Sequence, residues 1–248
     1  MKVVLENAAD FKRCIDAVSV LIDEAEFVFG SSGLAIKATD PSQISMIDFS
    51  LPKESFKEFE VKEDTRIGLD LSYLSQVMSR AKASDALEIS LDEDKSLIKV
   101  SFAGSSKRSF SLPVIDISSS DIPNPKIDFD SEIIFQAGIL QDALKDSALI
   151  TNHVLLEADA EGFYVKAKSS KGTVNSETLK GNKSVNQLNV KEESKSMFPL
   201  DYLQDITKAA ASGDEIKLEM KTNAPVKISY SVGGASIIYF LAPRIESE

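Results

Sequence analysis

The chain has 248 residues, 43% of them hydrophobic and 27% charged, which is typical of a soluble globular protein with room for two ordinary domains. Its 39 acidic and 28 basic side chains give a net charge of −11. This balance argues against a protein that holds nucleic acid by its overall field, because phosphate binding needs clustered Lys and Arg. Any basic surface must therefore be confined to one face.

One cysteine and one histidine limit the chemistry of the chain. A disulfide within the chain is excluded, and a zinc site lacks enough ligands. Cys14 lies on the apolar stripe of a predicted helix, which favours a core residue over a nucleophile. His153 follows a predicted helix, where we expect a solvated or capping role. We expect no cofactor and no metal.

No apolar run is long enough to span a bilayer, and Lys2 and Glu6 place charges too early for a signal peptide. We therefore expect an intracellular protein without a membrane partner.

Apolar residues at three- and four-residue steps predict an amphipathic helix near the N-terminus. Its stripe consists of Phe11, Cys14, Ile15, Val18, Leu21 and Ile22. The period then changes to two. The turn at 30–33 predicts a hairpin between strands at 27–29 and 34–36, and a further strand is expected at 44–51.

A second helix is predicted by a similar stripe, which consists of Tyr73, Leu74, Val77, Met78 and Ala81. Alternating apolar residues at 87–91 and 98–102 then predict two strands. The acidic run at 92–95 could be read as a metal site, but its position between two strands favours a solvated hairpin loop.

The segment 115–128 contains three consecutive serines together with Pro123 and Pro125, which fix φ and remove two amide donors. Such a segment links rather than folds alone. The sequence before it repeats after it, displaced by 128 or 129 residues. The matching blocks are 33–38 with 162–167, Tyr73-Leu74 with Tyr202-Leu203, 98–102 with 226–230, and Phe110 and Leu112 with Tyr239 and Leu241.

The second copy repeats both helices. Their stripes consist of Leu140, Ala143, Leu144, Ser147 and Ile150, and of Tyr202, Leu203, Ile206 and Ala210. We predict an α+β fold of two similar domains, each with two helices packed on antiparallel sheets. The first covers 1–115, the connector 116–128, and the second 129–248 with a C-terminal tail.

No catalytic motif is present: the sequence has no Gly-rich phosphate loop, no HExxH, no Cys-x-x-Cys and no nucleophile elbow. Carboxylates abound, so an acid/base pair assembled in space stays open as an alternative. We expect a protein that is not an enzyme.

The repeat, the connector and the C-terminal run together resemble the sliding clamp family of the proliferating cell nuclear antigen (PCNA) type, over essentially the whole chain. The resemblance rests on 7–25, 31–40, the helix after Leu71 and Ile122-Pro123 of the connector. Its most specific motif is the ending Leu241-Ala242-Pro243-Arg244-Ile245-Glu246. The family's DNA clamp fold implies a closed, ring-forming homotrimer around duplex DNA, with helices lining the hole. It implies a processivity factor that tethers replication and repair enzymes.

The resemblance also implies which residues face DNA. The basic positions of the family's inner helices carry over to Lys12, Arg13, Lys145 and Lys208. The chain departs from the pattern at Ser19, Gln76 and Ser79, where a basic residue is expected. An ordinary solvated helix face is the alternative interpretation of each lysine.

The implied partners are DNA polymerase, a clamp loader of the replication factor C type, a flap endonuclease and DNA ligase, which dock through a glutamine-plus-aromatic motif. The docking groove carries over to Thr39, Gln43, Ile44, Met46, Ile122, Pro123, Pro225, Phe240, Leu241, Ala242 and Pro243. For Phe240 and Met46, packing between the two copies is the alternative. The resemblance places the protein with the DNA, in the cytoplasm and nucleoid, or in a nucleus.

Differences between the two copies predict the joint between subunits. The positions equivalent to Arg80 and Lys82 in the second copy are Ala209 and Ala211. The positions equivalent to Asp142 and Asp146 in the first copy are Arg13 and Ala17. The segments 107–112 and 172–178 are polar edges, whereas their counterparts at 236–241 and 43–49 are apolar. We predict an interface in which the basic residues pair with Asp142 and Asp146 of the next subunit. It consists of Arg80, Lys82, Lys107, Arg108, Phe110, Asp142, Asp146, Val174, Ser176 and Thr178.

Three alternatives stay open. Within the family, the chain could be one subunit of a heterotrimeric or checkpoint-type clamp. Outside it, the sequence also fits a duplicated α+β enzyme or an adaptor that binds peptides without encircling DNA.

Overall fold

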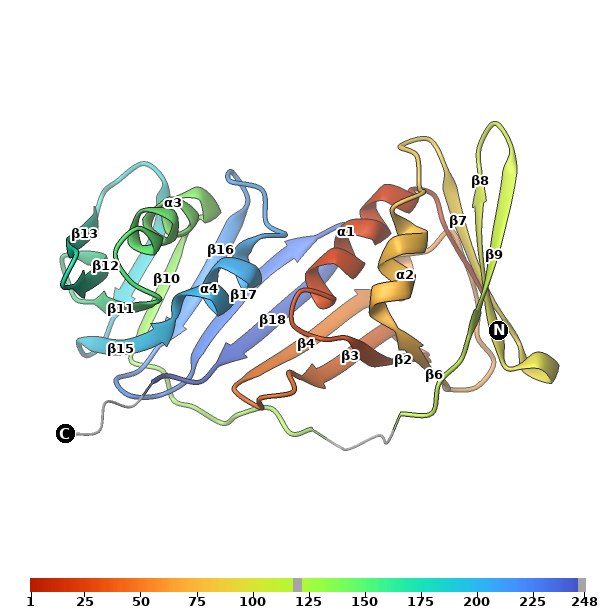
Figure 1. The fold of residues 1–248 in the computed structure, drawn as a ribbon, viewed down its shortest axis with the longest axis horizontal. Coiled ribbons are helices and arrows are strands. Elements are labelled where there is room, and N and C mark those ends of the chain that lie inside the picture. Colours follow the sequence, from red (N-terminus) through yellow and green to blue (C-terminus); the bar gives the residue numbers. More distant parts are fainter. Residues whose placement is uncertain (118–121, 245–248) are drawn as a thin grey trace. The chain divides into compact units, whose positions relative to one another are not determined.

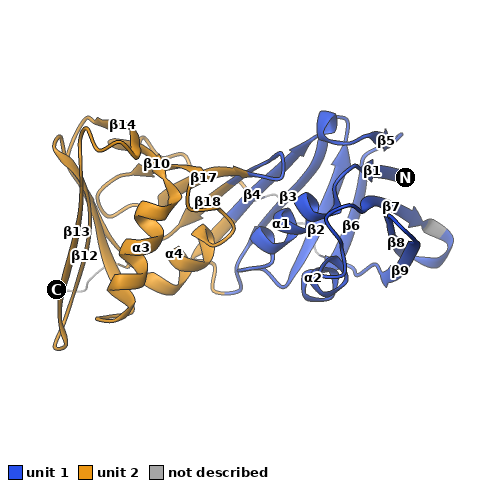
Figure 2. Cartoon of the chain, turned by 90° about the horizontal axis from the view of Figure 1, so that it is seen from above, with its two compact units in different colours: residues 1–41, 47–122, 232–237 blue, residues 42–46, 123–231, 238–248 orange. Residues whose placement is uncertain are grey.

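The computed structural model describes residues 1–117 and 122–244, except for the side chain of Glu93. The chain forms two compact units (Figure 2). Unit 1 comprises Met1–Pro41, Ile47–Ile122 and Val232–Ile237, and unit 2 comprises Ser42–Met46, Pro123–Ser231 and Ile238–Glu248. Each unit therefore holds most of one sequence copy.

Both helices of unit 1 begin after a side-chain cap. Helix α1 (Ala8–Val18) follows Asn7, whose Oδ1 accepts a hydrogen bond from the Ala9 amide at 2.9 Å. Helix α2 (Leu71–Met78) follows Asp70, whose Oδ1 accepts from the Tyr73 amide at 2.8 Å. These caps satisfy amides that the first turn leaves unpaired. The two helices pack side by side against the strands of unit 1 (Figure 1).

The strands of unit 1 form two groups, ordered β5-β1-β7-β8-β9 and β4-β3-β2-β6. Their bounds are β1 (Lys2–Leu5), β2 (Glu24–Gly30), β3 (Gly33–Thr39), β4 (Ser45–Pro52), β5 (Glu58–Glu60), β6 (Thr65–Asp70), β7 (Ala86–Asp92), β8 (Leu97–Ala103) and β9 (Lys107–Pro113). Short 3-10 helices occupy Lys53–Ser55 and Glu93–Lys95. The hairpin β2–β3 is confirmed, with Phe27 opposite Ile36, and the acidic run lies between β7 and β8 as predicted.

Unit 2 repeats this plan with helices α3 (Ala137–Ala148) and α4 (Leu200–Thr207). Backbone carbonyls here take the place of side-chain caps. The Ala137 amide donates to Asp214 O at 2.8 Å, and the Leu200 amide donates to Asn152 O at 2.9 Å. The first bond repeats unit 1, where the Ala8 amide donates to Asp85 O at 2.9 Å. The predicted duplication is thus present in the backbone hydrogen bonds.

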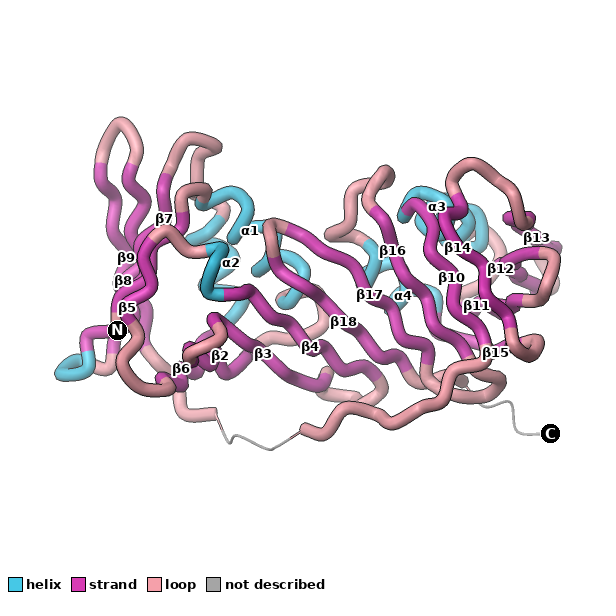
Figure 3. The backbone as a smooth tube through the Cα atoms, turned by 180° about the vertical axis from the view of Figure 1, so that it is seen from behind, coloured by secondary structure: helices cyan, strands magenta, loops and turns pink. Residues whose placement is uncertain are grey.

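The strands of unit 2 are ordered β13-β12-β11-β15 in one group and β14-β10-β16-β17-β18 in the other (Figure 3). Strand β18 is divided between the units at its middle. Their bounds are β10 (Ser131–Gln136), β11 (His153–Ala158), β12 (Gly162–Ser169), β13 (Gly172–Leu179), β14 (Val185–Val190), β15 (Ser194–Pro199), β16 (Glu215–Met220), β17 (Val226–Val232) and β18 (Ala235–Leu241). The α+β fold of two similar domains is confirmed.

All four helices end earlier than their apolar stripes predict. Ile22, Ala81, Ile150 and Ala210 lie beyond the last helical residue. Ile22 and Ala210 are nevertheless buried, at 5% and 4% exposure. An apolar residue in the turn after a helix still points toward the core, so the stripe continues although the helix has stopped.

Candidate functional site

The predicted DNA-facing residues of unit 1 lie on α1. Lys12 is half-buried and pairs with Asp16 four residues later, and Arg13 is exposed. The sequence analysis did not anticipate the pairing of Lys12, which neutralises part of the basic character of this face. Ser19 and Ser79, two of the three departures from the family pattern, cap their helices, and the Ser79 hydroxyl donates to the carbonyl of Gln76, the third departure, at 2.6 Å.

Unit 2 brings its two predicted DNA-facing lysines to one place. Lys145 of α3 and Lys208, the residue after α4, line a common hollow of about 370 Å³. Lys145 Nζ lies 2.9 Å from Asp142 Oδ1, an ion pair between exposed side chains, and Lys208 is exposed. Exposed pairs of this kind are weak and exchange readily with other anions. The hollow therefore presents exchangeable positive charge.

Gln141 fixes the two helices on either side of that hollow. Its Nε2 donates to the carbonyls of Thr207 and Ala210, both at 2.9 Å, and so provides hydrogen bonds to carbonyls at the end of α4. In the same hollow, burial raises the pKa of Asp205, while nearby Lys208 opposes that rise and Asp201 adds to it. Sequence reasoning missed Gln141, because no local pattern shows which distant carbonyl a side chain will reach.

Part of the predicted docking groove is assembled in unit 2. The Ala242 amide donates to Ile44 O at 2.8 Å, which brings the segment around Gln43 next to the C-terminal run. Gln43 is exposed and adopts a positive φ of 57°, and Ala242 and Pro243 are half-exposed. These residues offer accessible main chain and apolar atoms for a docking peptide.

Three predicted groove residues are buried: Met46 at 6%, Phe240 at 7% and Leu241 at 0% exposure. Side chains as buried as these offer little accessible surface to a docking peptide. The remaining predicted positions are accessible. Thr39 and Pro123 are exposed, and Ile122 and Pro225 are half-buried.

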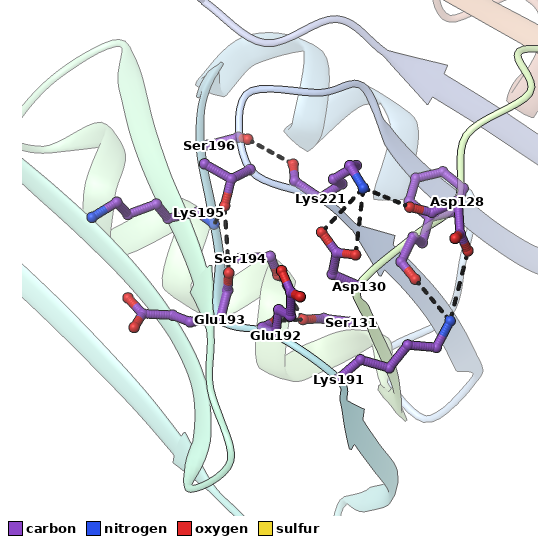
Figure 4. Close-up of polar contacts among 12 residues, drawn as sticks. Asp128, Asp130, Ser131, Lys191, Glu192, Glu193, Ser194, Lys195, Ser196 and Lys221 are labelled. Atoms are coloured by element: carbon purple, nitrogen blue, oxygen red, sulfur yellow. Dashed lines mark hydrogen bonds and ion pairs between the residues drawn. The ribbon is translucent and has the colours of Figure 1, made fainter.

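Two lysines fasten the end of the connector to unit 2 (Figure 4). Lys221 Nζ lies 3.1 Å from Asp128 O and 3.4 Å from the carboxylate of Asp130. Lys191 Nζ lies 3.4 Å from Phe129 O and 3.6 Å from Asp128 Oδ1. The lysines belong to loops far apart in sequence, so sequence reasoning could not pair them. They fix where the connector enters β10.

The predicted subunit edges are edge strands of their groups. β9 ends the order β5-β1-β7-β8-β9, and β13 ends the order β13-β12-β11-β15. On β13, Val174, Ser176 and Thr178 share one face, opposite Ala167, Val165 and Phe163 of β12. On β9, the half-buried Phe110 lies against Phe102 with ring centroids 5.9 Å apart.

Two of the predicted interface cations already have partners in unit 1. Arg108 pairs with the buried carboxylate of Asp85 and donates to Arg80 O at 2.8 Å, and Lys107 Nζ lies 3.5 Å from Glu88. Arg80 and Lys82 have exposed side chains, as do Asp142 and Asp146 of α3.

His153 keeps part of its surface accessible, and it also makes contacts that the sequence did not predict. It opens β11 and is half-buried, with Nδ1 2.8 Å from Asn152 Oδ1 and Nε2 3.1 Å from a guanidinium nitrogen of Arg244. Burial, and then the charge of Arg244, lower its pKa, whereas Asp201 opposes the change. A neutral ring satisfies both contacts, because Nδ1–H donates to Asn152 and Nε2 accepts from Arg244.

Comparisons with known proteins agree over the whole chain. The family description "Proliferating cell nuclear antigen, N-terminal domain" matches residues 1–122, and the C-terminal domain of the same family matches 122–245. The DNA polymerase sliding clamp of Methanococcus vannielii is 36% identical over 247 residues, which cover 97% of this chain and 98% of that protein. DNA polymerase sliding clamp 1 of Pyrobaculum aerophilum is 34% identical and covers 97% and 96%.

Solved structures agree as well. PCNA from Thermococcus kodakaraensis superposes with a TM-score of 0.94 at 25% identity, covering 98% of this chain and 99% of that one. A. fulgidus PCNA, bound to the C-terminal region of FEN-1, gives 0.89 at 29% identity and covers 100% and 99%. Among the described residues, no helix has the length and apolar character needed to cross a membrane. The chain belongs to the proliferating cell nuclear antigen family.

Proposed function

We propose that this chain is a DNA polymerase sliding clamp, a ring of three copies that encircles duplex DNA and tethers replication and repair enzymes to it. Relatives that match along nearly their whole length are named DNA polymerase sliding clamps. The chain acts by binding and topology, and it carries out no reaction of its own.

The observation that carries the ring is a pair of long edge strands. β9 and β13, of seven and eight residues, are the longest edge strands in the part of the chain that the structure describes. Of the other edge strands in the described residues, β5 has three residues and β14 has six, Ile115 bridges to β6, and Arg244 bridges to β15. One long edge in each unit allows β9 of one copy to pair with β13 of the next, and such head-to-tail joints can close a ring.

Charge at the joint is supplied by the residues that unit 1 leaves exposed. Arg108 and Lys107 are engaged with Asp85 and Glu88, so Arg80 and Lys82 are the cations that would pair with Asp142 and Asp146 of the next copy. Each such pair contributes about 0 to 1 kcal/mol and is screened by salt. The trimer should therefore loosen as the salt concentration rises.

The proposed function requires only weak contact with DNA. Lys12, Arg13, Lys145 and Lys208 supply exposed or loosely paired charge on helices of a chain whose net charge is −11. A closed ring stays on DNA without tight phosphate contacts, and weak contacts let it slide.

Partners would dock on the surface around Gln43, Ile44, Ala242 and Pro243 and on the connector. The A. fulgidus relative was solved with the C-terminal region of FEN-1, which supports a flap endonuclease as one partner. DNA polymerase, a clamp loader and DNA ligase are proposed to use the same surface. The groove would hold the glutamine and the aromatic residues of their motif.

The mass of the purified chain at low and high salt tests the ring. We expect a species near three times 27.0 kDa that dissociates as salt rises. Arg80→Asp should weaken the trimer, and a second change, Asp142→Arg, should restore it. A monomer at every salt concentration, or no rescue by the charge swap, would count against the proposed joint.

Retention on DNA tests the topology. After loading, the protein should remain on closed circular DNA and be lost when the circle is cut. Charge reversal of Lys145 and Lys208 should lower loading and processivity, whereas reversal of Lys53, an exposed residue of the 3-10 helix Lys53–Ser55, should not. Equal retention on circular and linear DNA would favour an adaptor without a ring.

A further inference from the structure

A second surface of unit 2, apart from the docking groove, has the character of a binding site. A pocket of about 740 Å³ opens on the sheet β13-β12-β11-β15. It lies within the size range of ligand sites. Strand register explains its floor, because Met197, Leu155, Lys166 and Asn175 stand directly opposite one another on four successive strands and therefore share one face.

That face is the one turned away from the core. The alternate residues Val154, Leu156, Val165 and Ala167 are buried at 0 to 4% exposure, whereas Leu155, Lys166 and Met197 are half-buried. The next row of the same face adds Lys168, which stands opposite Thr173. The floor thus combines two apolar side chains with lysines.

Charge in the pocket is opposite to that of the protein. The charged side chains of its lining are Lys166, Lys168 and Arg244, and the lining contains no carboxylate, although the chain as a whole has 39 acidic and 28 basic side chains. Lys166 is paired with Glu157 at 2.7 Å, which leaves Lys168 and Arg244 as the cations available to a ligand. A pocket free of acidic side chains in an acidic protein selects for anions.

Arg244 is held in place at this pocket. Its amide donates to Met197 O at 2.7 Å, and its guanidinium contacts both ring nitrogens of His153, at 3.1 and 3.3 Å. Anchored on both its main chain and its side chain, Arg244 loses little further freedom when a ligand binds.

We propose that this pocket, formed on the outer face of β11, β12, β13 and β15, binds an acidic segment of a partner protein, with carboxylates on Lys168 and Arg244 and an apolar side chain on Leu155 and Met197. A peptide fits better than a nucleic acid, because the lining has no Phe, Tyr or Trp ring on which a base could stack, and the ring of His153 is already held between Asn152 and Arg244. A small inorganic anion would leave the apolar floor uncovered. The proposal stands apart from ring function, since binding is measured on the chain itself.

Methionine methyl groups provide a direct reporter. The chain has five methionines, of which Met46, Met78 and Met220 are buried at 0 to 6% exposure, whereas Met197 lies in the pocket. The full-length protein, labelled at its methionine methyls, is titrated with a short peptide of glutamates around a central pair of leucines. We expect the Met197 signal to shift while the three buried methionines stay in place and report an intact fold.

Charge reversal distinguishes the pocket from the general surface. Lys168→Glu together with Arg244→Glu should weaken peptide binding about tenfold, since two ionic contacts become repulsive. The matched control is Lys171→Glu, an exposed lysine in the adjacent β12–β13 turn that does not line the pocket. The control should bind as the unchanged protein does.

Four results would overturn the proposal. The first two are no shift of the Met197 signal at millimolar peptide, and an equal shift with a peptide that has glutamine in place of glutamate. The other two are an equal shift with inorganic phosphate or single-stranded DNA, and a shift of the Met197 signal caused simply by removing residues 245–248. The last result would identify the chain's own acidic end as the occupant. Retention on circular DNA is a separate readout, so failure of this pocket and failure of the clamp function are distinguishable.

Discussion

The same strand of the repeat has opposite environments in the two copies. β9 lies at the edge of its sheet in unit 1, and its residues alternate between exposed and half-buried until Leu112. Its counterpart β18 is paired and buries Ile237, Tyr239, Phe240 and Leu241 at 0 to 7% exposure. The two copies share the same backbone arrangement, so β9 and β18 differ in their side chains, which are mostly polar on the edge strand and mostly apolar on the interior strand. A long polar edge strand such as β9 is the surface on which the proposed joint between copies would form.

The difference between the two strands also affects a buried aspartate, Asp85. Asp85 and Asp214 occupy equivalent turns, and each accepts a hydrogen bond from the amide three residues before it, at 2.9 and 2.8 Å. In unit 1, Arg108 of β9 also pairs with Asp85. The equivalent position on β18 is Ile237, which is fully buried. The edge strand can bring a cation to this turn because its arginine still reaches water.

Placing arginine on the interior strand should produce the largest effect. Ile237→Arg puts a guanidinium at a position with 0% exposure. We expect a loss of more than about 4 kcal/mol in unfolding free energy, or failure to fold, because a buried charge without a partner is strongly unfavourable. Chemical denaturation followed by circular dichroism measures this. Ile237→Val, which keeps the site apolar, is the control and should cost about 1 kcal/mol.

The reverse exchange, Arg108→Ile, should cost about 3 kcal/mol, because it leaves the Asp85 carboxylate, 3% exposed, without its cation. Adding Asp85→Asn should recover much of the loss, since an amide oxygen can still accept from the Lys82 amide. A double-mutant cycle in the unfolding free energy checks this. Additive effects of the two changes would show that the pair contributes nothing.

Features that depend on apolar periodicity and on the internal repeat could be predicted from the sequence. The duplication, the four helices and the β2–β3 hairpin all follow from apolar spacing and glycine turns, and the structure confirms them. The helix ends were predicted too late. An apolar residue such as Ile22 indicates that its side chain points toward the core, but it does not indicate whether the backbone is still helical there.

Long-range partners could not be predicted for a different reason. The contacts of Gln141 with the carbonyls after α4, and of Lys191 and Lys221 with the connector, join residues 62 or more positions apart that no local pattern relates. The burial of Met46 and Phe240 likewise depends on which strands surround them. These contacts and this burial depend on the tertiary structure and not on the local sequence.

The copies also differ at α1, where Cys14 corresponds to Ala143, and this difference predicts a pH effect. Burial raises the pKa of the Cys14 thiol to about 12. In the unfolded chain the thiol ionises near pH 8.5, so the stability present below that pH is lost progressively as pH rises toward 12. Relative to Cys14→Ala, the unchanged protein should lose about 2 kcal/mol between pH 8 and pH 10. Parallel pH profiles of the two proteins would contradict this.

The smallest expected effect concerns the strand that begins each copy. The first copy begins with β1, and its counterpart β10 in the second copy is entered from the connector, which Lys191 and Lys221 hold. At the repeat offset of 129, Lys62 corresponds to Lys191, but Asp92 corresponds to Lys221, so the first copy lacks the second lysine of this anchor. Lys191→Met with Lys221→Met should cost about 1 kcal/mol at most in global stability, because the contacts are exposed.

Its local effect should be larger than its global one. With the lysines removed, hydrogen exchange at amides 126–129 should rise, and a docking peptide carrying the glutamine-plus-aromatic motif should bind about threefold to fivefold more weakly, since the connector must be ordered again on binding. Lys195→Met, an exposed lysine of β15 whose side chain points away from the connector in Figure 4, is the matched control. Unchanged peptide affinity with faster exchange would separate the anchor from docking. Unchanged exchange would mean that the main-chain bonds of Asp130 to Met220 and Lys191, at 3.0 and 2.8 Å, hold the connector without help from the lysine side chains.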